Sequence, residues 1–326
     1  MPLPPMALRR RLTVAAAALL LALTACASPQ GSPQASPQAT VGAATIDDCG
    51  VPVTPRAQPA ERILAIKSTA AELVVALGLG DALVATAFLD APLETEGTPP
   101  PTIEGMPSRE AVLALEPDAV VAGWESAFAP EAAGDRAALH ALGVTTWVSP
   151  AACRSVDVAP LSWDALLDEL ADAGTVLGAP EAGAALAAEQ RAALDAIEPL
   201  TSEATALWYS SGDDAPYVGG GSGAPQLVLD SAGLTNVAAE VGEAWTTMSW
   251  EALAASDPDM IVLVDAAWHT AASKIDRLRA NPATAELDAV REGRFVVVPF
   301  PMAEAGVGTV GAVELVTDGA RGLGLR

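Results

Sequence analysis

The chain has 326 residues, of which 51% are hydrophobic and only 4% aromatic, and its formal net charge at pH 7 is −24. This acidic balance excludes a nucleic-acid-binding protein, because a phosphate backbone needs a basic footprint. The charge identifies no partner by itself, since carboxylates solvated on helix faces are its simplest explanation.

The first 25 residues predict an export signal. Three arginines at positions 9–11 precede a short apolar run that ends in small residues, and the run is too short to span a bilayer. Leu23-Thr24-Ala25-Cys26 resembles a bacterial lipobox, whose cysteine is lipidated and becomes the mature N-terminus. An ordinary signal peptide with a chance cysteine is the alternative. We expect a lipid anchor at Cys26 that holds the exported protein at the outer face of the cell membrane.

Residues 26–45 predict a flexible stalk. Ser-Pro-Gln recurs three times between residues 28 and 38, in a stretch with almost no apolar side chains that could repay the entropy of ordering. The folded part is expected to begin near residue 46 and, at about 280 residues, it exceeds the usual single core. We therefore expect an N-terminal lobe at 46–160, connecting helices at 161–200 and a C-terminal lobe at 201–326.

Two cysteines remain once Cys26 is lipidated. Cys49 and Cys153 form an even count in an oxidising compartment, which predicts a disulfide between them. The mature chain keeps 14 of the 17 basic side chains against 41 acidic ones, so its net charge is −27.

Strands alternate with helices along the chain, which predicts an α/β fold with mostly parallel sheets covered on both faces. In the first lobe, buried strands are expected at 62–66, 83–86, 119–122 and 145–148, with helices at 68–77 and 130–142. Helices at 164–176 and 180–197 follow, and the second is the candidate connection between the lobes. The second lobe should contain strands near 206–209, 260–264 and 295–298 and a closing helix at about 308–322.

An internal repeat supports two lobes of similar design. Residues 108–121 reappear 141 residues later as 249–262, and seven of the fourteen pairs are identical. In each copy a serine can cap a short helix, a Pro-Asp pair ends it, and an apolar run follows as a buried strand. A cleft between two such lobes is a common place for a ligand.

The chain resembles a known family of binding proteins. It is similar to the periplasmic-binding family that delivers ferric siderophores and cobalamin to ABC importers. The similarity lies in residues 62–73 and 76–81, in the two Pro-Asp units of the repeat, and in residues 289–294. The resemblance implies a class III periplasmic-binding fold, in which two Rossmann-like lobes with parallel sheets are joined by a long connecting helix. It also implies a rigid hinge and a ligand held in the groove without chemistry.

A narrower resemblance concerns the ligand. The chain resembles an actinobacterial branch of this family, and that branch is proposed to carry a precursor of the deazaflavin coenzyme F-420. The resemblance lies in segments 67–69, 87–90, 123–126, 149–153 and 209–212. A ferric siderophore and cobalamin are the alternative ligands. A phosphorylated deazaflavin would need both a cation and stacking rings.

Ligands of open parallel sheets sit beyond the carboxyl ends of the strands, so the loops there supply the candidate binding residues. Lys67 precedes a helix N-terminus that favours a phosphate or carboxylate, and a snorkelling surface lysine is the alternative. Aromatic side chains in these loops would stack on a flat or chelated ligand, and core filling is the alternative. The candidates are Lys67, Ser68, Thr69, Phe88, Trp124, Glu125, Ser126, Tyr209, Ser210, Tyr217, Trp245 and Trp268. The glycines of 217–222 would let backbone approach a ligand, although a plain flexible turn explains them as well.

The family resemblance also implies a docking site for the importer permease. It places one exposed glutamate at the top of each lobe, and Glu72 and Glu251 occupy the matching positions. Such a pair would set register and association rate by pairing with arginines of the permease. Each glutamate is also explained as a first-turn carboxylate that the helix dipole stabilises.

Competing functions lack the residues they need. The two histidines, His140 and His269, cannot build a three-histidine metal site. There is no Walker sequence, and residues 220–224 lack the final glycine of a nucleophile elbow. We therefore predict a monomeric receptor lipoprotein of an ABC importer, without enzymatic activity, metal or cofactor. A surface lipoprotein for signalling or adhesion without a permease is the first alternative, and a secreted hydrolase is the second.

Overall fold

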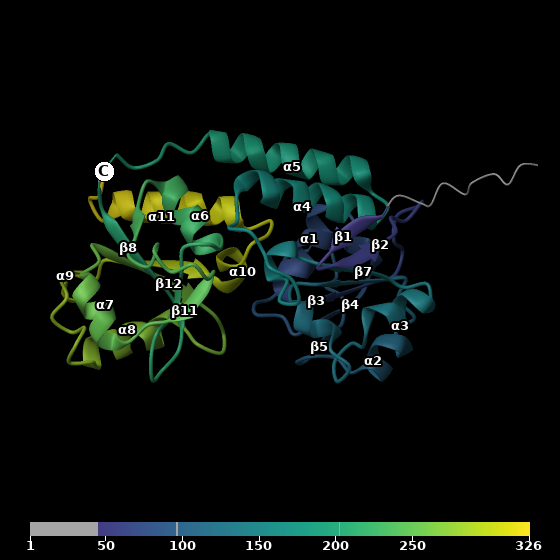
Figure 1. Cartoon of the computed structure of the whole chain (residues 1–326), viewed down its shortest axis with the longest axis horizontal. Helices are drawn as coiled ribbons and strands as arrows, with labels where there is room; N and C mark the ends of the chain where they lie inside the picture. Colours follow the sequence, from purple (N-terminus) through teal and green to yellow (C-terminus); the bar gives the residue numbers. More distant parts are fainter. Residues whose placement is uncertain (1–44, 96, 202) are drawn as a thin grey trace, which may run out of the picture. The chain divides into compact units, whose positions relative to one another are not determined.

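The computed structural model describes residues 45–95, 97–201 and 203–326. The predicted export signal, Cys26 and nearly all of the predicted stalk lie outside the described residues. No helix within the described ranges is long and apolar enough to cross a membrane. These described residues belong to one compact unit, which contains two sheets that divide it into two lobes (Figure 1).

The first lobe is built around a five-stranded sheet in the order β5-β4-β3-β6-β7, in which every pair is parallel. Its strands are β3 (Ile63–Ile66), β4 (Leu83–Ala87), β5 (Thr102–Ile103), β6 (Ala119–Ala122) and β7 (Thr145–Val148). All residues of β3 and β6 are buried, as expected of central parallel strands covered on both faces. Four of these strands match the predicted ones. The two-residue β5 is too short to give a sequence pattern.

Three α-helices and a short hairpin surround this sheet. The helices are α1 (Ser68–Ala76), α2 (Arg109–Ala114) and α3 (Arg136–Ala141), and the hairpin pairs β1 (Ile46–Asp48) with β2 (Val51–Val53). The prediction of a helix at 130–142 was wrong at its start. Gly134 has a φ of 100°, and the Asp135 side chain accepts a hydrogen bond from the Ala138 N–H, so the helix begins only at Arg136.

Two helices follow the first sheet. A short turn joins α4 (Trp163–Val176) to α5 (Pro180–Asp195), and the two helices approach closely at Gly174 and Gly183. Leu186 of α5 packs in the first lobe, whereas Leu194 and Ile197 pack against the core of the second. Helix α5 therefore bridges the lobes, as Figure 1 shows.

The second lobe contains a six-stranded mixed sheet, with order β11-β9-β8-β12-β13 and β10 beside β8. Strands β8, β10, β12 and β13 run parallel, whereas β9 pairs antiparallel with both β8 and β11. The strands are β8 (Thr205–Ser211), β9 (Tyr217–Gly219), β10 (Thr235–Asn236), β11 (Trp245–Thr247), β12 (Met260–Asp265) and β13 (Phe295–Pro299). The expectation of a loop over 217–222 was wrong for its first half.

Glycines make the second half of that segment possible. A Cβ at Gly220 would lie 2.2 Å from the Glu243 carbonyl oxygen, and a Cβ at Gly221 would lie 2.0 Å from that of Ala239. The glycines therefore serve a close approach of backbone segments rather than a loose turn. Helices α6 (Ala224–Ala232), α7 (Trp250–Ser256), α8 (Ala271–Ala280), α9 (Asp288–Arg291), α10 (Phe300–Ala303) and α11 (Thr309–Gly322) complete the lobe.

The two copies of the sequence repeat fold alike. Ser108 and Ser249 cap α2 and α7, because each serine hydroxyl accepts a hydrogen bond from the backbone N–H of the third residue of its helix. The Asp118 carboxylate accepts hydrogen bonds from backbone N–H groups that precede β3, and Asp259 does the same at the first residue of β8. In both lobes the Pro-Asp pair thus follows the end of a helix, and its aspartate accepts hydrogen bonds at the start of the neighbouring strand.

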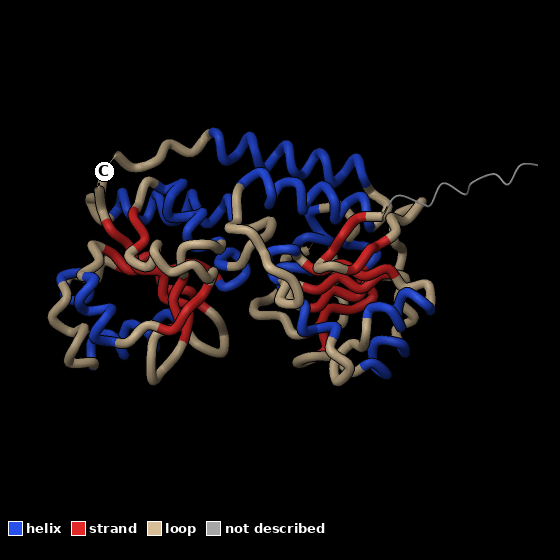
Figure 2. The backbone as a smooth tube through the Cα atoms, viewed as in Figure 1, coloured by secondary structure: helices blue, strands red, loops and turns tan. Residues whose placement is uncertain are grey.

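Each sheet has a core on both of its faces. In β3, Ile63 and Ala65 pack on one face, while Leu64 and Ile66 pack on the other. Alternate residues of β8 and β12 divide in the same way between two clusters of the second lobe. Figure 2 shows helices on both sides of each sheet, which confirms the predicted α/β architecture.

Candidate functional site

Loops from both lobes line a pocket of about 380 Å³. The first lobe and the segment after it contribute Gly123 and residues 149, 151–154, 156–159 and 161. The second lobe contributes Tyr217 and residues 222–224, 242–245 and 304–305. Most of the first-lobe residues follow the carboxyl ends of strands, where ligands of parallel sheets bind. We call this space the interlobe pocket.

A stacked aromatic pair forms part of the pocket. The rings of Tyr217 and Trp245 lie 5.9 Å apart with an interplanar angle of 16°. They come from the paired strands β9 and β11, so the backbone of the sheet fixes their separation. Tyr217 is 39% exposed, which leaves much of its surface open to the pocket or to solvent.

Lys67 lies beside this pocket in a closed environment. Only 2% of the residue is exposed, and its ammonium pairs with the buried Asp90 carboxylate. The ammonium also lies 4.3 Å from the ring centre of Phe88, 4.0 Å from that of Trp124 and 5.2 Å from that of Phe300. We call these three rings the aromatic cage. Burial lowers the pKa of Lys67, while Asp90 acts in the opposite direction.

This geometry matches neither prediction for Lys67. The ammonium does not extend along the surface, and its charge is already paired, so it offers no free cation to a phosphate or carboxylate. Arg154 is the cation that lines the pocket, and its guanidinium donates a hydrogen bond to the Cys153 carbonyl.

The family of the chain follows from a comparison with known proteins. The profile of the periplasmic binding protein family matches residues 63–302, which is most of the chain. The chain belongs to the periplasmic binding protein family.

Similar proteins extend this result. A cobalamin-binding protein of Halobacterium salinarum is 28% identical over 227 residues, which cover 66% of this chain and 57% of that protein. The chain thus spans little more than half the length of this curated relative. A periplasmic heme-binding protein from Roseiflexus sp. RS-1 has a TM-score of 0.62 and 26% identity, covering 80% of this chain and 99% of the other.

Two further structures share the fold. A periplasmic binding protein from Veillonella parvula has a TM-score of 0.70 at 21% identity, over 85% of this chain and 97% of its own. An ABC-type Fe3+-hydroxamate transport system from Saccharomonospora viridis has a TM-score of 0.68 at 23% identity, over 85% and 99%. The periplasmic binding protein described here has the predicted class III fold, and its family consists of substrate-binding proteins.

The other first-lobe candidates of this periplasmic binding protein have different surroundings. Ser68 accepts hydrogen bonds from the backbone N–H groups of Asp90 and Ala91, so it fixes the loop that carries the ion-pair partner of Lys67. Thr69 lines a small cavity beneath Gly123. Ser126 lines an adjoining hollow of about 710 Å³ on the first lobe, which shares Ala152 and Arg154 with the interlobe pocket.

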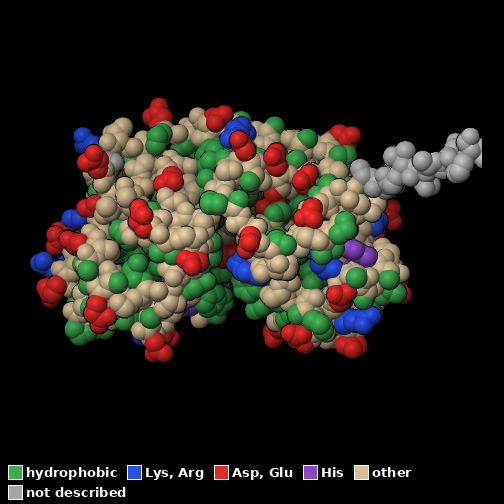
Figure 3. Space-filling model, viewed as in Figure 1, with side chains coloured by type: hydrophobic (Ala, Val, Ile, Leu, Met, Phe, Trp, Pro, Cys, Tyr) green, Lys and Arg blue, Asp and Glu red, His purple; other side chains and the backbone are tan. Residues whose placement is uncertain are grey.

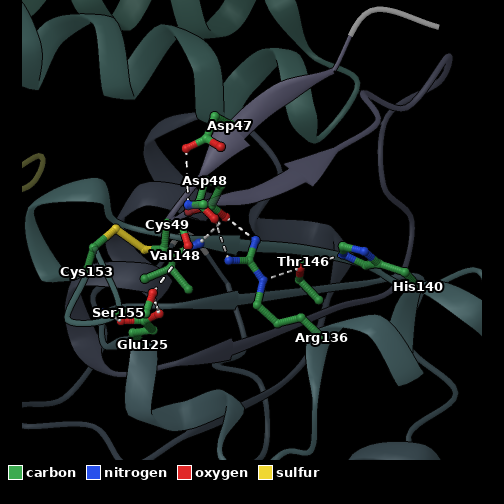
Figure 4. A network of polar contacts seen from close by, with 11 residues as sticks. Asp47, Asp48, Cys49, Glu125, Arg136, His140, Thr146, Val148, Cys153 and Ser155 are labelled. Atoms are coloured by element: carbon green, nitrogen blue, oxygen red, sulfur yellow. Dashed lines mark hydrogen bonds and ion pairs between the residues drawn. A yellow bond between two sulfur atoms is a disulfide. The ribbon is translucent and has the colours of Figure 1, made fainter. Parts of the chain in front are cut away.

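Glu125 points towards the loop after β7. Its carboxylate accepts hydrogen bonds from the Arg154 and Ser155 N–H groups and from the Ser155 hydroxyl (Figure 4). Burial alone would raise the pKa of Glu125, but the hydrogen bonds from Ser155 and Arg154 lower it. Glu125 therefore positions the pocket-lining segment 154–161 instead of presenting a free carboxylate.

Cys49 and Cys153 form a disulfide at the start of this segment, with their Cα atoms 5.3 Å apart. The Ser155 hydroxyl is also within 3.3 Å of the Cys49 carbonyl oxygen, and at the far end the Leu161 N–H donates to the Ser222 carbonyl. Beside the disulfide, Asp48 pairs with Arg136 (Figure 4). The segment is thus attached to the N-terminal hairpin and to the second lobe.

The second-lobe candidates divide between the core, the pocket and the exposed surface. Tyr209 is fully buried against Trp250 and His269, and its hydroxyl donates to the Gly212 carbonyl. Burial raises the pKa of Tyr209 to about 12. Tyr209 is therefore a core residue, as the alternative interpretation held, and Ser210 beside it is also buried. Trp268 is 55% exposed and contacts Phe300 edge-on at 5.5 Å.

Sequence reasoning missed Phe300 and Glu304. Both follow β13, so the rule that selected loops after strands would have found them had it been applied to this strand. Burial raises the pKa of Glu304, while a hydrogen bond with Trp124 and the charge of Lys67 lower it. Glu304 lines the interlobe pocket and connects it electrostatically with Lys67.

The two predicted docking glutamates are not equivalent. Glu251 is exposed in the first turn of α7, but Glu72 is half-buried in α1, where burial and the nearby Asp90 raise its pKa to about 7. The prediction that Glu72 is exposed was wrong. The residue that matches Glu251 in the internal repeat is Glu110, which is exposed in the first turn of α2.

Proposed function

We propose that this chain is the extracytoplasmic receptor of an ABC importer and that it carries a small molecule in the interlobe pocket. The observation that supports this most directly is the pocket itself, which joins a stacked aromatic pair of one lobe to an arginine of the other. Its volume lies in the range of pockets that bury a drug-sized ligand.

The pocket chemistry favours a ligand with a flat ring and an anionic group. Tyr217 and Trp245 offer ring faces for stacking, and Arg154 offers the cation. The first residue of helix α6, Ala224, also lines the pocket. No side chain of the described residues caps the N-terminus of this helix, so the first-turn N–H groups, which the proline at 225 lacks, favour negative charge. A phosphorylated deazaflavin precursor of coenzyme F-420 combines these features.

The alternative ligands would need a pocket of different size or chemistry. The relatives named for cobalamin and heme bind flat macrocycles, for which this pocket would have to widen. A ferric siderophore would use Arg154 more than the rings. These two classes are the alternatives within the same function.

Membrane attachment and permease docking complete the proposal. Lipidation of Cys26 and a stalk over 26–45 would keep the receptor at high effective concentration near its permease. We assign the docking pair to Glu110 and Glu251, because both are exposed and occupy equivalent positions of the repeat. Paired carboxylates of this kind would orient the receptor on permease arginines.

Uptake by a deletion strain tests the receptor function. We expect the strain to lose uptake of one of the three ligand classes and to regain it with the wild-type gene. Complementation with the double variant Glu110→Arg/Glu251→Arg should restore less than about a tenth of the uptake, because arginines of the receptor would then face arginines of the permease. The same variant should bind ligand as tightly as the wild type.

Glu131→Arg is the matched control, because Glu131 is exposed on the first lobe outside both repeat helices. It should restore uptake fully. A deletion strain that takes up all three ligand classes normally would contradict the importer function and favour a surface lipoprotein that acts without a permease.

A further inference from the structure

The chain contains only two lysines, and both are buried. Lys274 is held within the second lobe, where its ammonium donates hydrogen bonds to the Val264 and His269 carbonyls. The surroundings of Lys67 are different, because they come from both lobes.

Three groups of the first lobe and two of the second surround the Lys67 ammonium. Asp90 supplies the ion pair, and Phe88 and Trp124 supply two ring faces from the same lobe. Phe300 closes the aromatic cage from the second lobe, and Trp124 and Phe300 are themselves in edge contact at 6.5 Å. The charge of Lys67 also acts on Glu304 of the second lobe. The cage is therefore complete only while the lobes are together.

The backbone is strained where it builds the cage. Lys67 has a φ of 82° and Phe88 a φ of 51°, values that side chains other than glycine rarely adopt. The neighbouring loop needs Gly123, since a Cβ there would lie 2.3 Å from the Thr69 hydroxyl oxygen. Strain of this kind persists where the surrounding structure holds it, and it concentrates at functional positions.

We propose that Lys67 is a positioning residue that holds the two lobes together and thereby fixes the width of the interlobe pocket. A buried ammonium must keep its partners or regain water. Separation of the lobes would remove Phe300 and Glu304 from Lys67 and open the ammonium to solvent. The ligand part of this inference rests on the proposed function, but the contact between the lobes does not.

Amine labelling tests the contact without a ligand. The full mature chain would carry Cys26→Ser, so that its N-terminal amine serves as a reference for the two lysines. The native protein is treated briefly with an amine-reactive acylating reagent, and the extent of labelling at each amine is measured by peptide mass spectrometry. In the wild type, both lysines should react far more slowly than the N-terminal amine.

Phe300→Leu keeps an apolar side chain but removes the ring that the second lobe contributes. We expect Lys67 to be acylated about tenfold faster in this variant, because lobe separation becomes more frequent. Lys274 should stay slow, since its carbonyl partners lie in its own lobe. Phe128→Leu is the matched control, because Phe128 faces the cation Arg136 entirely within the first lobe. It should leave Lys67 unreactive.

Three results would overturn the proposal. Lys67 could react as fast as the N-terminal amine in the wild type, or its reactivity could stay unchanged in Phe300→Leu. Equal acceleration of Lys274 would show that unfolding of the lobes, rather than their separation, exposes the amine. Each result contradicts a contact between the lobes at Lys67.

Binding of two probes, the deazaflavin precursor and cyanocobalamin, tests the effect on the pocket. Lys67→Met should weaken binding of whichever probe the wild type binds, and Lys67→Arg should restore most of it because the cation returns. Equal affinity of Lys67→Met and the wild type would contradict a role in pocket width. A wild type that binds neither probe would count against the proposed function and would leave the labelling result unaffected.

Discussion

Glu169 shows how a single residue can make stability depend on pH. It lies on the buried face of α4, and burial raises the pKa of its carboxyl to about 8. The folded state therefore binds one more proton than the unfolded state between the ordinary pKa of 4.5 and about 8. This contribution to stability is complete below the lower value and is lost as the pH rises through the higher one.

We expect the free energy of unfolding to fall between pH 5 and pH 8 by up to about 1.4 kcal/mol per pH unit through this group. Glu169→Gln should remove that part of the slope, because the amide does not titrate. Chemical denaturation over a pH series measures the effect. Asp168→Asn, on the exposed face of the same helix, should keep the wild-type slope, and parallel profiles for Glu169→Gln and the wild type would refute the assignment.

Only some residues of the candidate site could be predicted from the sequence. The rule of loops after strands selected Trp124 and Trp245, which the structure places at the cage and in the pocket. The same rule could not separate Tyr209 from Tyr217, because the depth of a side chain depends on which strands lie beside it. Nor could it foresee the Lys67 ion pair, since Asp90 lies 23 residues away on another loop.

At the scale of elements, α4 and α5 form the connection between the lobes. A Cβ on Gly174 would lie 2.6 Å from the Gly183 Cα, so the helices meet where neither has a side chain. The sequence predicted both helices, at 164–176 and 180–197. It could not predict their contact, because glycine in a helix usually indicates only a local loss of stability.

Gly183→Ala should destabilise the protein by about 1–3 kcal/mol, because the new methyl group would lie against the backbone of α4. Thermal unfolding followed by circular dichroism measures the change. Gly322→Ala in α11 is the control, since no atom of the described residues lies within 4 Å of its new Cβ, and it should leave stability unchanged or raise it by up to about 1 kcal/mol. Equal melting temperatures for both variants would show that the two helices are not closely packed at Gly183.

The strands that the sequence did not predict share a physical reason. Strands β1, β2, β5, β9, β10 and β11 have two or three residues each, and β9 ends in glycine. Such segments carry no long apolar run, and their pairing is decided by contacts distant in sequence. The long buried strands and the repeated Pro-Asp units were predictable because their pattern is local.

At the scale of the whole molecule, the acidic charge does not form one patch on the face shown in Figure 3, where Asp and Glu side chains are distributed over both lobes. This agrees with solvated carboxylates as the simplest explanation of the charge. Predicted and newly found candidate residues instead lie together in the interlobe pocket, which is lined by Arg154, Tyr217, Trp245 and Glu304. The proposed function therefore depends on the interlobe pocket rather than on the outer surface.

Binding in the interlobe pocket can be measured by the tryptophan fluorescence of the full mature chain with Cys26→Ser, titrated in turn with the deazaflavin precursor, ferric siderophores and cobalamin. We expect one of these ligands to quench the fluorescence saturably, and this quenching should be lost in Trp245→Ala. It should be retained in Trp163→Phe, because Trp163 donates a hydrogen bond to Ser231 outside the interlobe pocket. Quenching that survives Trp245→Ala would place the ligand elsewhere, and no response to any of the three would contradict the proposed ligand classes.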